Sequence, residues 1–300
     1  MDMTQNKCCR HGANLRRRRR RRRKILHFII FSCSIIAVAV FVAVGSRMIT
    51  SGDGGTNKYD VEAGNNTYDN AVIENSKISE NNKIQNEQSM LDDIMNSTKY
   101  PKQLQELALK NEEALEFVYD YPAEHVKEHT IDLTEEASMD SVPLFVQWDK
   151  RWGYEKYSGN FFAASGCGPT TLSMVVVYLT HNRDASPIAV AKYSKEAGYS
   201  VDGSGSSWTL ISEGCRHYGV KAKTVALDES RMKAELDAGH PIVVNVGPGD
   251  FTDTGHFMVI TGYDDEGFSI NDPNSIEKSG KRWLFKNISS QIRAVWSMYV

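Results

Sequence analysis

Cysteine is scarce in this chain beyond its first 33 residues. Of the five cysteines in 300 residues, only Cys167 and Cys215 come later. So few cysteines exclude a disulfide-stapled scaffold, although a single bond between these two is an alternative for the domain that contains them. No two cysteines have the CxxC spacing of a zinc site. We therefore expect no metal and no cofactor.

Positive charge is also scarce after the N-terminal end. Residues 1–24 hold 11 of the 35 Lys and Arg residues, eight of them consecutive arginines at 16–23. The remainder has 24 basic and 37 acidic residues, a net charge of −13. Because a nucleic-acid interface needs Lys and Arg against phosphate, we expect no nucleic-acid partner.

A single long hydrophobic run, residues 25–44, follows the arginines and contains no Lys, Arg, Asp or Glu. Its length matches a bilayer core at about 1.5 Å per helical residue. The basic block on one side predicts a cytoplasmic tail at 1–24, a transmembrane helix at 25–45 and an extracellular remainder. The alternative is a cleaved signal peptide ending near Ala43-Val44-Gly45, which also exports the remainder.

The exported part has three compositions in succession. Residues 46–100 are rich in Asn, Ser, Asp, Glu and Gly, which predicts a flexible extracellular stalk. Apolar residues then recur at helical spacing from Pro101 to Tyr121, which predicts helices in a segment of residues 101–139, with Pro122 just past their end. Residues 140–300 have the pattern of one compact domain.

Within residues 140–300, helical patterns precede strand patterns. Gly166 and Pro169 mark the start of a helix that runs from Cys167 to Leu179. Further helices are predicted at 188–197, 208–218 and 229–238. Strands are predicted at 241–246, 256–263, 268–271, 283–285 and 294–299. Helices followed by an antiparallel sheet indicate the α+β class.

Cys167 lies in the stretch ASGCGPTTLSM, at the predicted start of a helix. Helix N-termini carry partial positive charge and free N–H groups, which favour a thiolate. The flanking glycines let a substrate backbone approach. A buried structural cysteine is the ordinary alternative, but this setting is typical of a nucleophile.

His256 begins an apolar strand in TGHFMVITGYDDEG, and Asp272 closes the next strand in INDPNS. The short turn between them predicts a hairpin that brings the start of one strand beside the end of the other. Asp272 would then accept a hydrogen bond from the Nδ1–H of His256 and orient the ring. Singly, each residue also fits a plainer role, as a half-buried histidine or a turn aspartate.

Gln147 lies 20 residues before Cys167, among apolar neighbours. Its amide is a candidate donor to an oxyanion, beside the backbone N–H of Cys167. A surface position on an edge strand is an equally good interpretation of the local sequence.

In order and role, these four residues resemble the catalytic set of papain-like cysteine peptidases. The stretches VPLFVQWDKRWG, SGCGPTTLSMV and GDFTDTGHFMVITGYDDEGFSINDPNS more closely resemble the peptidase C39-like family, which is related to bacteriocin-processing peptidase domains. The resemblance covers residues 140–298. It implies a papain-like α+β fold and an acyl-enzyme formed by Cys167, with His256 as base, Asp272 as its orienter and Gln147 at the oxyanion position.

The resemblance also limits the substrate. Bacteriocin-processing members are fused to a transporter and cut double-glycine leaders in the cytoplasm, whereas this domain is predicted outside the cell. Peptides of the cell wall or of extracellular proteins are the expected substrates, in a Gram-positive bacterium. Alternatives are acyl or peptidyl transfer by the same thiol, a non-catalytic binding module, and a zinc site of Cys167, His256 and Asp272.

Overall fold

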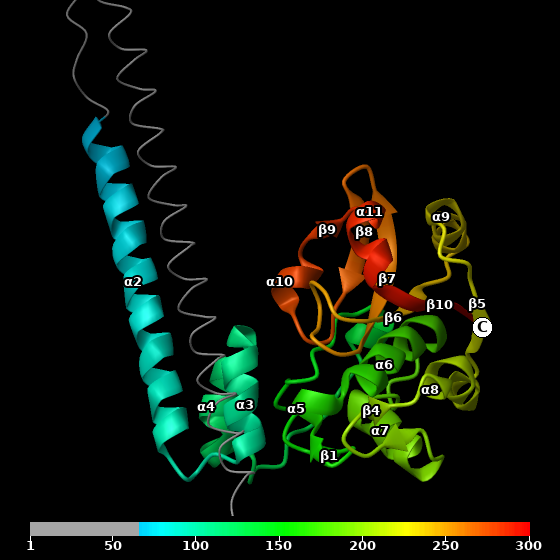
Figure 1. Cartoon of the computed structure of the whole chain (residues 1–300), viewed down its shortest axis with the longest axis horizontal. Coiled ribbons are helices and arrows are strands. Elements are labelled where there is room, and N and C mark those ends of the chain that lie inside the picture. The colour runs from blue at the N-terminus through cyan, green and yellow to red at the C-terminus, as the bar shows by residue number, and fades with distance from the viewer. Residues whose placement is uncertain (1–65) are drawn as a thin grey trace, which may run out of the picture. The chain divides into compact units, whose positions relative to one another are not determined.

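The computed structural model describes residues 66–300, with side chains from residue 79 onward (Figure 1). The predicted basic tail and transmembrane helix, residues 1–45, lie outside this range. Among the described residues, no helix is both long and apolar enough to cross a membrane. The chain divides into two units, Met1–Asp69 and Asn70–Val300, and all packing described below lies within the second.

Helix α2 (Asn66–Asn96) occupies much of the segment in which composition predicts a flexible stalk. The structure therefore differs from that expectation over these residues. The helix contains neither Gly nor Pro, and its Glu, Gln, Lys and Met residues favour a helix, although its most frequent residue, Asn, does not. Near its C-terminal end Ile94 is fully buried, which fixes this end against the helices that follow.

The predicted helical segment after Pro101 consists of α3 (Lys102–Lys110), η1 (Glu112–Ala114) and α4 (Leu115–Glu124). Helix α4 runs through Pro122, where an end was expected. Only two helical residues follow this proline, so the helix still ends within one turn of it. The apolar side chains of the segment form one cluster with Phe161 and Ala163, so the segment packs against the domain behind it.

The domain is built on a six-stranded antiparallel sheet with the strand order β5-β10-β6-β7-β8-β9. Its strands are β5 (Lys221–Thr224), β6 (Ile242–Val246), β7 (His256–Asp264), β8 (Gly267–Asn271), β9 (Arg282–Trp283) and β10 (Ile292–Tyr299). The sequence predicts five of them, and the α+β class with an antiparallel sheet is confirmed. The sequence does not predict β5, because an edge strand of four residues, Lys-Ala-Lys-Thr, has too few apolar residues to show the alternation typical of a strand.

The helices also follow the predicted order, with shifts at their ends. They are α5 (Phe162–Ser165), α6 (Cys167–Thr180), α7 (Pro187–Glu196), α8 (Thr209–Ser212), α9 (Glu229–Asp237), α10 (Ile276–Ser279) and α11 (Phe285–Ile288), with short 3-10 turns η2 (Glu136–Ser138), η3 (Gly214–Tyr218) and η4 (Ser289–Gln291). The predicted helix 208–218 divides into α8 and η3, and the predicted strand 283–285 corresponds to β9, although its last residue, Phe285, already begins α11. Two small hairpins, β1 (Lys156–Tyr157) with β2 (Asn160–Phe161) and β3 (Ser200–Val201) with β4 (Gly205–Ser206), lie outside the main sheet.

Helices cover both faces of the sheet (Figure 1). Alternate strand residues point to opposite faces, so Val243 and Val259 join the cluster around α6 and α7, while Val244 and Ile260 join the cluster around α9 and α11. Helix α6 is apolar around most of its circumference and is buried over Gly168–Val177. This packing fixes the N-terminal end of α6 against the sheet.

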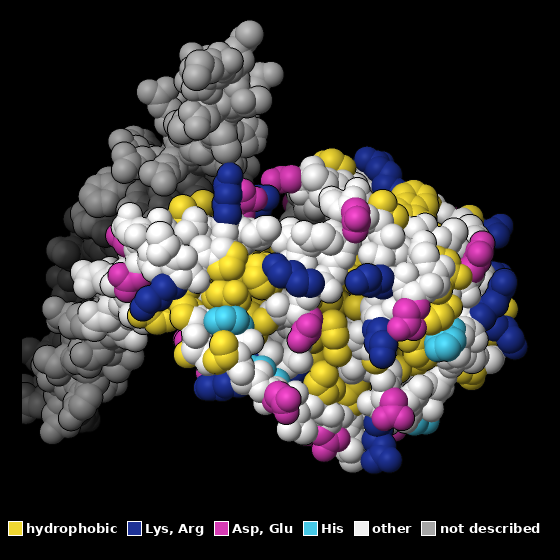
Figure 2. Space-filling model, turned by 90° about the horizontal axis from the view of Figure 1, so that it is seen from below, with side chains coloured by type: hydrophobic (Ala, Val, Ile, Leu, Met, Phe, Trp, Pro, Cys, Tyr) yellow, Lys and Arg dark blue, Asp and Glu magenta, His cyan; other side chains and the backbone are white. Residues whose placement is uncertain are grey.

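Charged side chains of both signs are scattered over the surface. On the face seen in Figure 2, Lys and Arg side chains alternate with Asp and Glu, and hydrophobic side chains lie between them. This face therefore presents a mixed charge instead of a field of one sign.

Candidate active site

The fold brings Cys167, His256 and Asp272 together from three elements. Cys167 is the first residue of α6 and is half-buried, and His256 is the first residue of β7 and is buried. Asp272 directly follows β8 and is fully buried. Because β7 and β8 form the predicted hairpin and α6 packs across β7, the three side chains converge at one end of these two strands.

The imidazole of His256 lies between the thiol and the carboxylate. Its Nε2 is 2.6 Å from Asp272 Oδ1, and the ring and the Cys167 thiol are close enough to shift each other's pKa. The sequence interpretation had Asp272 binding Nδ1, and the structure corrects this to Nε2. With Nε2 on the carboxylate, Nδ1 is the ring nitrogen left for the thiol, and Asp272 still fixes the ring and its tautomer.

The electrostatics of the pair favour the charged forms. Burial works to raise the pKa of Cys167, but the hydrogen bond and the charge of His256, with the backbone N–H groups of Phe257 and Gly168, outweigh it and lower the pKa. Burial works to lower the pKa of His256, but the charge and hydrogen bond of Asp272 and the contact with Cys167 raise it to about 10. Both shifts favour the thiolate–imidazolium form of the pair.

Gln147 lies beside this line of residues, in a turn ahead of α5. Its side chain is buried, with 4% exposed, so the surface interpretation of this residue is wrong. Its Nε2 donates to the carbonyl of Ala163 at 2.8 Å, and its backbone N–H donates to the carbonyl of Pro273, next to Asp272, at 2.7 Å. The amide has a second N–H to offer, and Oε1 has no partner among the described residues. Gln147 thus joins the segment before Cys167 to the segment after β8.

The glycines beside Cys167 accommodate the protein's own side chains. A Cβ on Gly166 would lie 2.5 Å from the ring of Phe162, and one on Gly168 would lie 2.5 Å from Ser206 Oγ. The sequence interpretation assigned this space to a substrate backbone, whereas the structure fills it with Phe162 and Ser206. Ser206 belongs to the Gly- and Ser-rich stretch of residues 203–207, which therefore borders the Cys167 end of α6.

Comparison with known families identifies the family of the domain that contains these residues. Residues 139–300 match the Peptidase_C39 like family, and this range is more than half of the chain. The chain belongs to the Peptidase_C39 like family. It therefore carries a C39-like cysteine peptidase domain, as the sequence predicts, and α2, α3 and α4 lie outside the matched range. No curated protein matches the chain.

Two solved structures are similar to the C39-like domain. The peptidase domain of Streptococcus ComA, described as a bi-functional ABC transporter involved in a quorum sensing pathway, is 18% identical, with a TM-score of 0.39; the match covers 53% of this chain and 96% of that one. A C39-like peptidase from Bacillus anthracis is 16% identical, with a TM-score of 0.34, covering 53% of this chain and 95% of that one.

Both cysteines of the C39-like domain are free thiols, which contradicts the disulfide alternative. Cys215 is fully buried, and burial raises its pKa to about 11. This environment suits a packing residue and leaves Cys167 as the reactive thiol. Within residues 66–300, no three His, Cys, Asp or Glu side chains converge in the manner of metal ligands, so the geometry does not support the zinc alternative.

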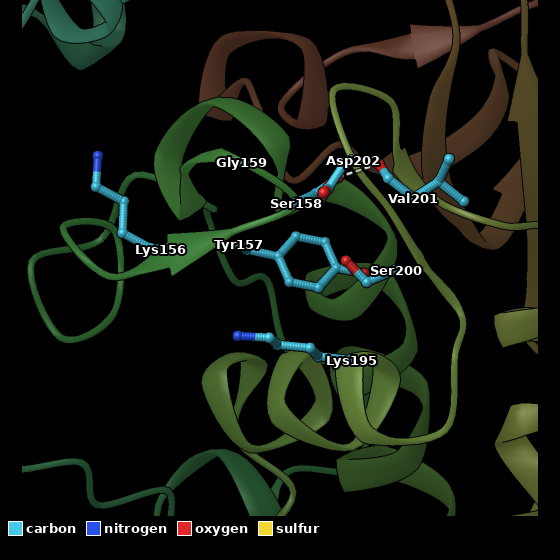
Figure 3. A pocket seen from close by; sticks show the side chains of 8 residues that line it. All are labelled: Lys156, Tyr157, Ser158, Gly159, Lys195, Ser200, Val201 and Asp202. Atoms are coloured by element: carbon cyan, nitrogen blue, oxygen red, sulfur yellow. Dashed lines mark hydrogen bonds between the residues drawn. The ribbon is translucent and has the colours of Figure 1, made fainter.

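A cavity of about 460 Å³ lies beside Tyr157 (Figure 3). It is lined by Lys156, Tyr157, Ser158, Gly159, Lys195, Ser200, Val201 and Asp202. The Tyr157 hydroxyl bonds to Ser194 Oγ at 2.8 Å and to Ser206 Oγ at 2.6 Å. Ser206 also packs on Gly168, so the contacts of Tyr157 and Ser206 connect the lining of this cavity to the start of α6. No sequence pattern points to Tyr157, since a single tyrosine in a two-residue strand has no distinguishing pattern.

Proposed function

We propose that this protein is a membrane-anchored extracellular cysteine peptidase or amidase in which Cys167, His256, Asp272 and Gln147 act together on a peptide bond. The observation that carries the proposal is the buried line from thiol to imidazole to carboxylate, in which Asp272 Oδ1 lies 2.6 Å from His256 Nε2. Membership of the C39-like family supports it independently. The chemistry needs no cofactor.

In the proposed reaction, the thiolate of Cys167 attacks the carbonyl carbon of the scissile amide. The electron pair of the C=O bond moves to oxygen, and the backbone N–H of Cys167 and the second N–H of Gln147 stabilise the oxyanion. The C–N bond then breaks, and the imidazolium of His256 gives its proton to the leaving amine. In the second half, His256 takes a proton from water, the hydroxide attacks the thioester, and the S–C bond breaks to restore the thiolate.

The membrane anchor and the extracellular location rest on residues 1–45. The arginine block at 16–23 followed by the uncharged run at 25–44 supports a single-pass helix with the C39-like domain outside. In that location, peptides of the cell wall or of extracellular proteins are the accessible substrates. Protease protection of right-side-out membrane vesicles tests this part: digestion of the C39-like domain from outside is expected, and its full protection would contradict the proposal.

Alkylation of Cys167 across pH tests the proposed thiolate. The pKa of Cys167 is lowered and that of His256 is raised to about 10. The thiolate–imidazolium pair therefore persists at every pH between these two pKa values. We expect iodoacetamide to modify Cys167 at pH 6 at nearly its neutral rate, well below the free-thiol pKa of about 8.5. Mass spectrometry of the full chain reads Cys167 and the buried Cys215 separately, and Cys215 is the internal control. A Cys167 rate that rises only near pH 8.5 would contradict the proposal.

Replacing Gln147 by alanine tests the oxyanion role. We expect kcat to fall by about 10²–10³-fold, the usual cost of one oxyanion donor. The alkylation rate of Cys167 should stay near the wild-type value, because iodoacetamide forms no oxyanion. The matched control is Gln105→Ala, since the amide of Gln105 also donates to backbone carbonyls but lies on α3. Equal losses of kcat in both variants would indicate a structural role.

A further inference from the structure

The loop that carries Asp272 is held from outside the C39-like domain. We call residues 272–277 the Asp272 loop. The carboxylate of Glu113 accepts hydrogen bonds from the backbone N–H of Ile276 at 2.7 Å and of Glu277 at 3.1 Å, and also from the hydroxyl of Ser275. Glu113 lies in η1, more than 160 positions earlier in the chain. Three donors converge on one carboxylate, so these hydrogen bonds are charge-assisted and specific. We call this contact between Glu113 and the Asp272 loop the clamp.

A second residue of the same turn binds the same loop. The side chain of Asn111 donates to the carbonyl of Asn274 at 2.9 Å and to its Oδ1 at 3.1 Å. Its own Oδ1 accepts the backbone N–H of Glu113 at 3.0 Å, so one side chain fixes both the loop and the residue that clamps it. The indole of Trp148, next to Gln147, donates to the same Asn274 carbonyl at 3.3 Å.

These contacts are connected through Asn274 to the Asp272 carboxylate, which binds His256. The backbone N–H of Asn274 donates to Asp272 Oδ1 at 2.8 Å, the same oxygen that binds His256 Nε2. The other oxygen, Oδ2, is buried and has no partner among the described residues. The rotation of the Asp272 carboxylate is therefore set by the position of Asn274, and Asn111 sets the position of Asn274.

The helical segment that carries both residues is itself firmly attached. Leu104, Leu107 and Val118 pack with Phe161, directly before α5, and with Ala163 within α5, ahead of Cys167. The segment therefore contacts both the cysteine side and the aspartate side of the triad. A shift of α3 and η1 would reach the Asp272 loop directly.

We propose that Asn111 and Glu113 are positioning residues for Asp272, so that the helices before the C39-like domain form a necessary part of its active site. The proposal rests on the proposed function, because it assigns a role through Asp272. With the clamp removed, Asp272 moves off His256 Nε2, the imidazole loses its orientation, and the Cys167 thiolate loses its counter-charge. A displacement of this kind, remote from the reacting atoms, typically costs about 10²-fold in rate.

The test is the alkylation of Cys167 by iodoacetamide against pH in the full chain. We expect Glu113→Ala to slow alkylation at pH 6 by about 10-fold or more and to move the rate profile toward that of a free thiol. The alkylation rate of Glu113→Gln should lie between those of Glu113→Ala and the wild type, because one side-chain oxygen still accepts hydrogen bonds from the loop. Glu106→Ala is the matched control, since Glu106 is an exposed glutamate on α3, and it should match the wild type.

A double-mutant comparison separates positioning from a general loss of structure. If Glu113 acts through Asp272, Glu113→Ala should add little to the defect of Asp272→Asn, whereas independent effects would multiply. Multiplying effects, or a wild-type profile in Glu113→Ala, would overturn the inference while leaving the proposed function intact. A wild-type Cys167 that is inert below pH 8 would instead refute the proposed function, and the inference with it.

Discussion

Replacing Cys167 by alanine should reduce peptide-bond hydrolysis by at least about 10⁴-fold, because the variant has no nucleophile to form the thioester. The other thiol of the domain cannot take its place. Cys215 is fully buried in the apolar cluster around α6, and burial raises its pKa to about 11. The matched control is Cys215→Ala, which removes a thiol from the same domain and should keep most of the activity.

The measurement is cleavage of a complex peptide mixture by the full-length protein, read by mass spectrometry in water enriched in oxygen-18. Hydrolysis puts the heavy oxygen into each new C-terminus, because water attacks the thioester. Acid quenching should also trap an acyl group on Cys167. New termini that persist in Cys167→Ala would contradict the nucleophile assignment, and products that carry an added amine would indicate transfer in place of hydrolysis.

The elements that carry the triad could be predicted because their signals are local. Gly166 and Pro169 mark the start of α6, and the prediction of a helix from Cys167 to Leu179 differs from the structure by one residue. The turn after Asp264 likewise predicts the β7–β8 hairpin, and this hairpin brings His256 to Asp272. Segments without such start and turn residues are harder to predict, as the polar edge strand β5 and the Asn-rich helix α2 illustrate.

The residues of the site could be predicted from the sequence, but the hydrogen bonds that connect them could not. Which ring nitrogen of His256 faces Asp272 depends on the rotation of one side chain, and no spacing encodes that rotation. The role of Asn111 and Glu113 is also invisible, because their partners at 274–277 lie about 160 positions away and no periodic pattern joins them. Contacts between a turn and a loop are specified by tertiary packing alone.

Removing the imidazole should have an effect nearly as large as removing the thiol. We expect His256→Ala to reduce hydrolysis by about 10³–10⁴-fold or more, because the leaving amine and the attacking water both lose their proton-transfer partner. The same change removes the hydrogen bond and the charge that lower the pKa of Cys167, and burial, which raises that pKa, then prevails. The thiolate fraction at pH 6 should therefore fall below that of a free cysteine.

The two consequences of His256→Ala can be measured in one preparation. Hydrolysis of the peptide mixture reports the proton transfers, and iodoacetamide labelling of Cys167 across pH reports the thiolate. The matched control is His217→Ala, since His217 is an exposed histidine that stacks on Tyr193 at 4.0 Å in η3. Because ordinary thiols gain reactivity about tenfold per pH unit below their pKa, a labelling profile that shifts upward by more than one unit in His256→Ala alone would assign the low pKa to this imidazole. An unchanged profile would mean that the α6 terminus and the N–H groups of Phe257 and Gly168 hold the thiolate by themselves, and His256 would then act only as a proton carrier.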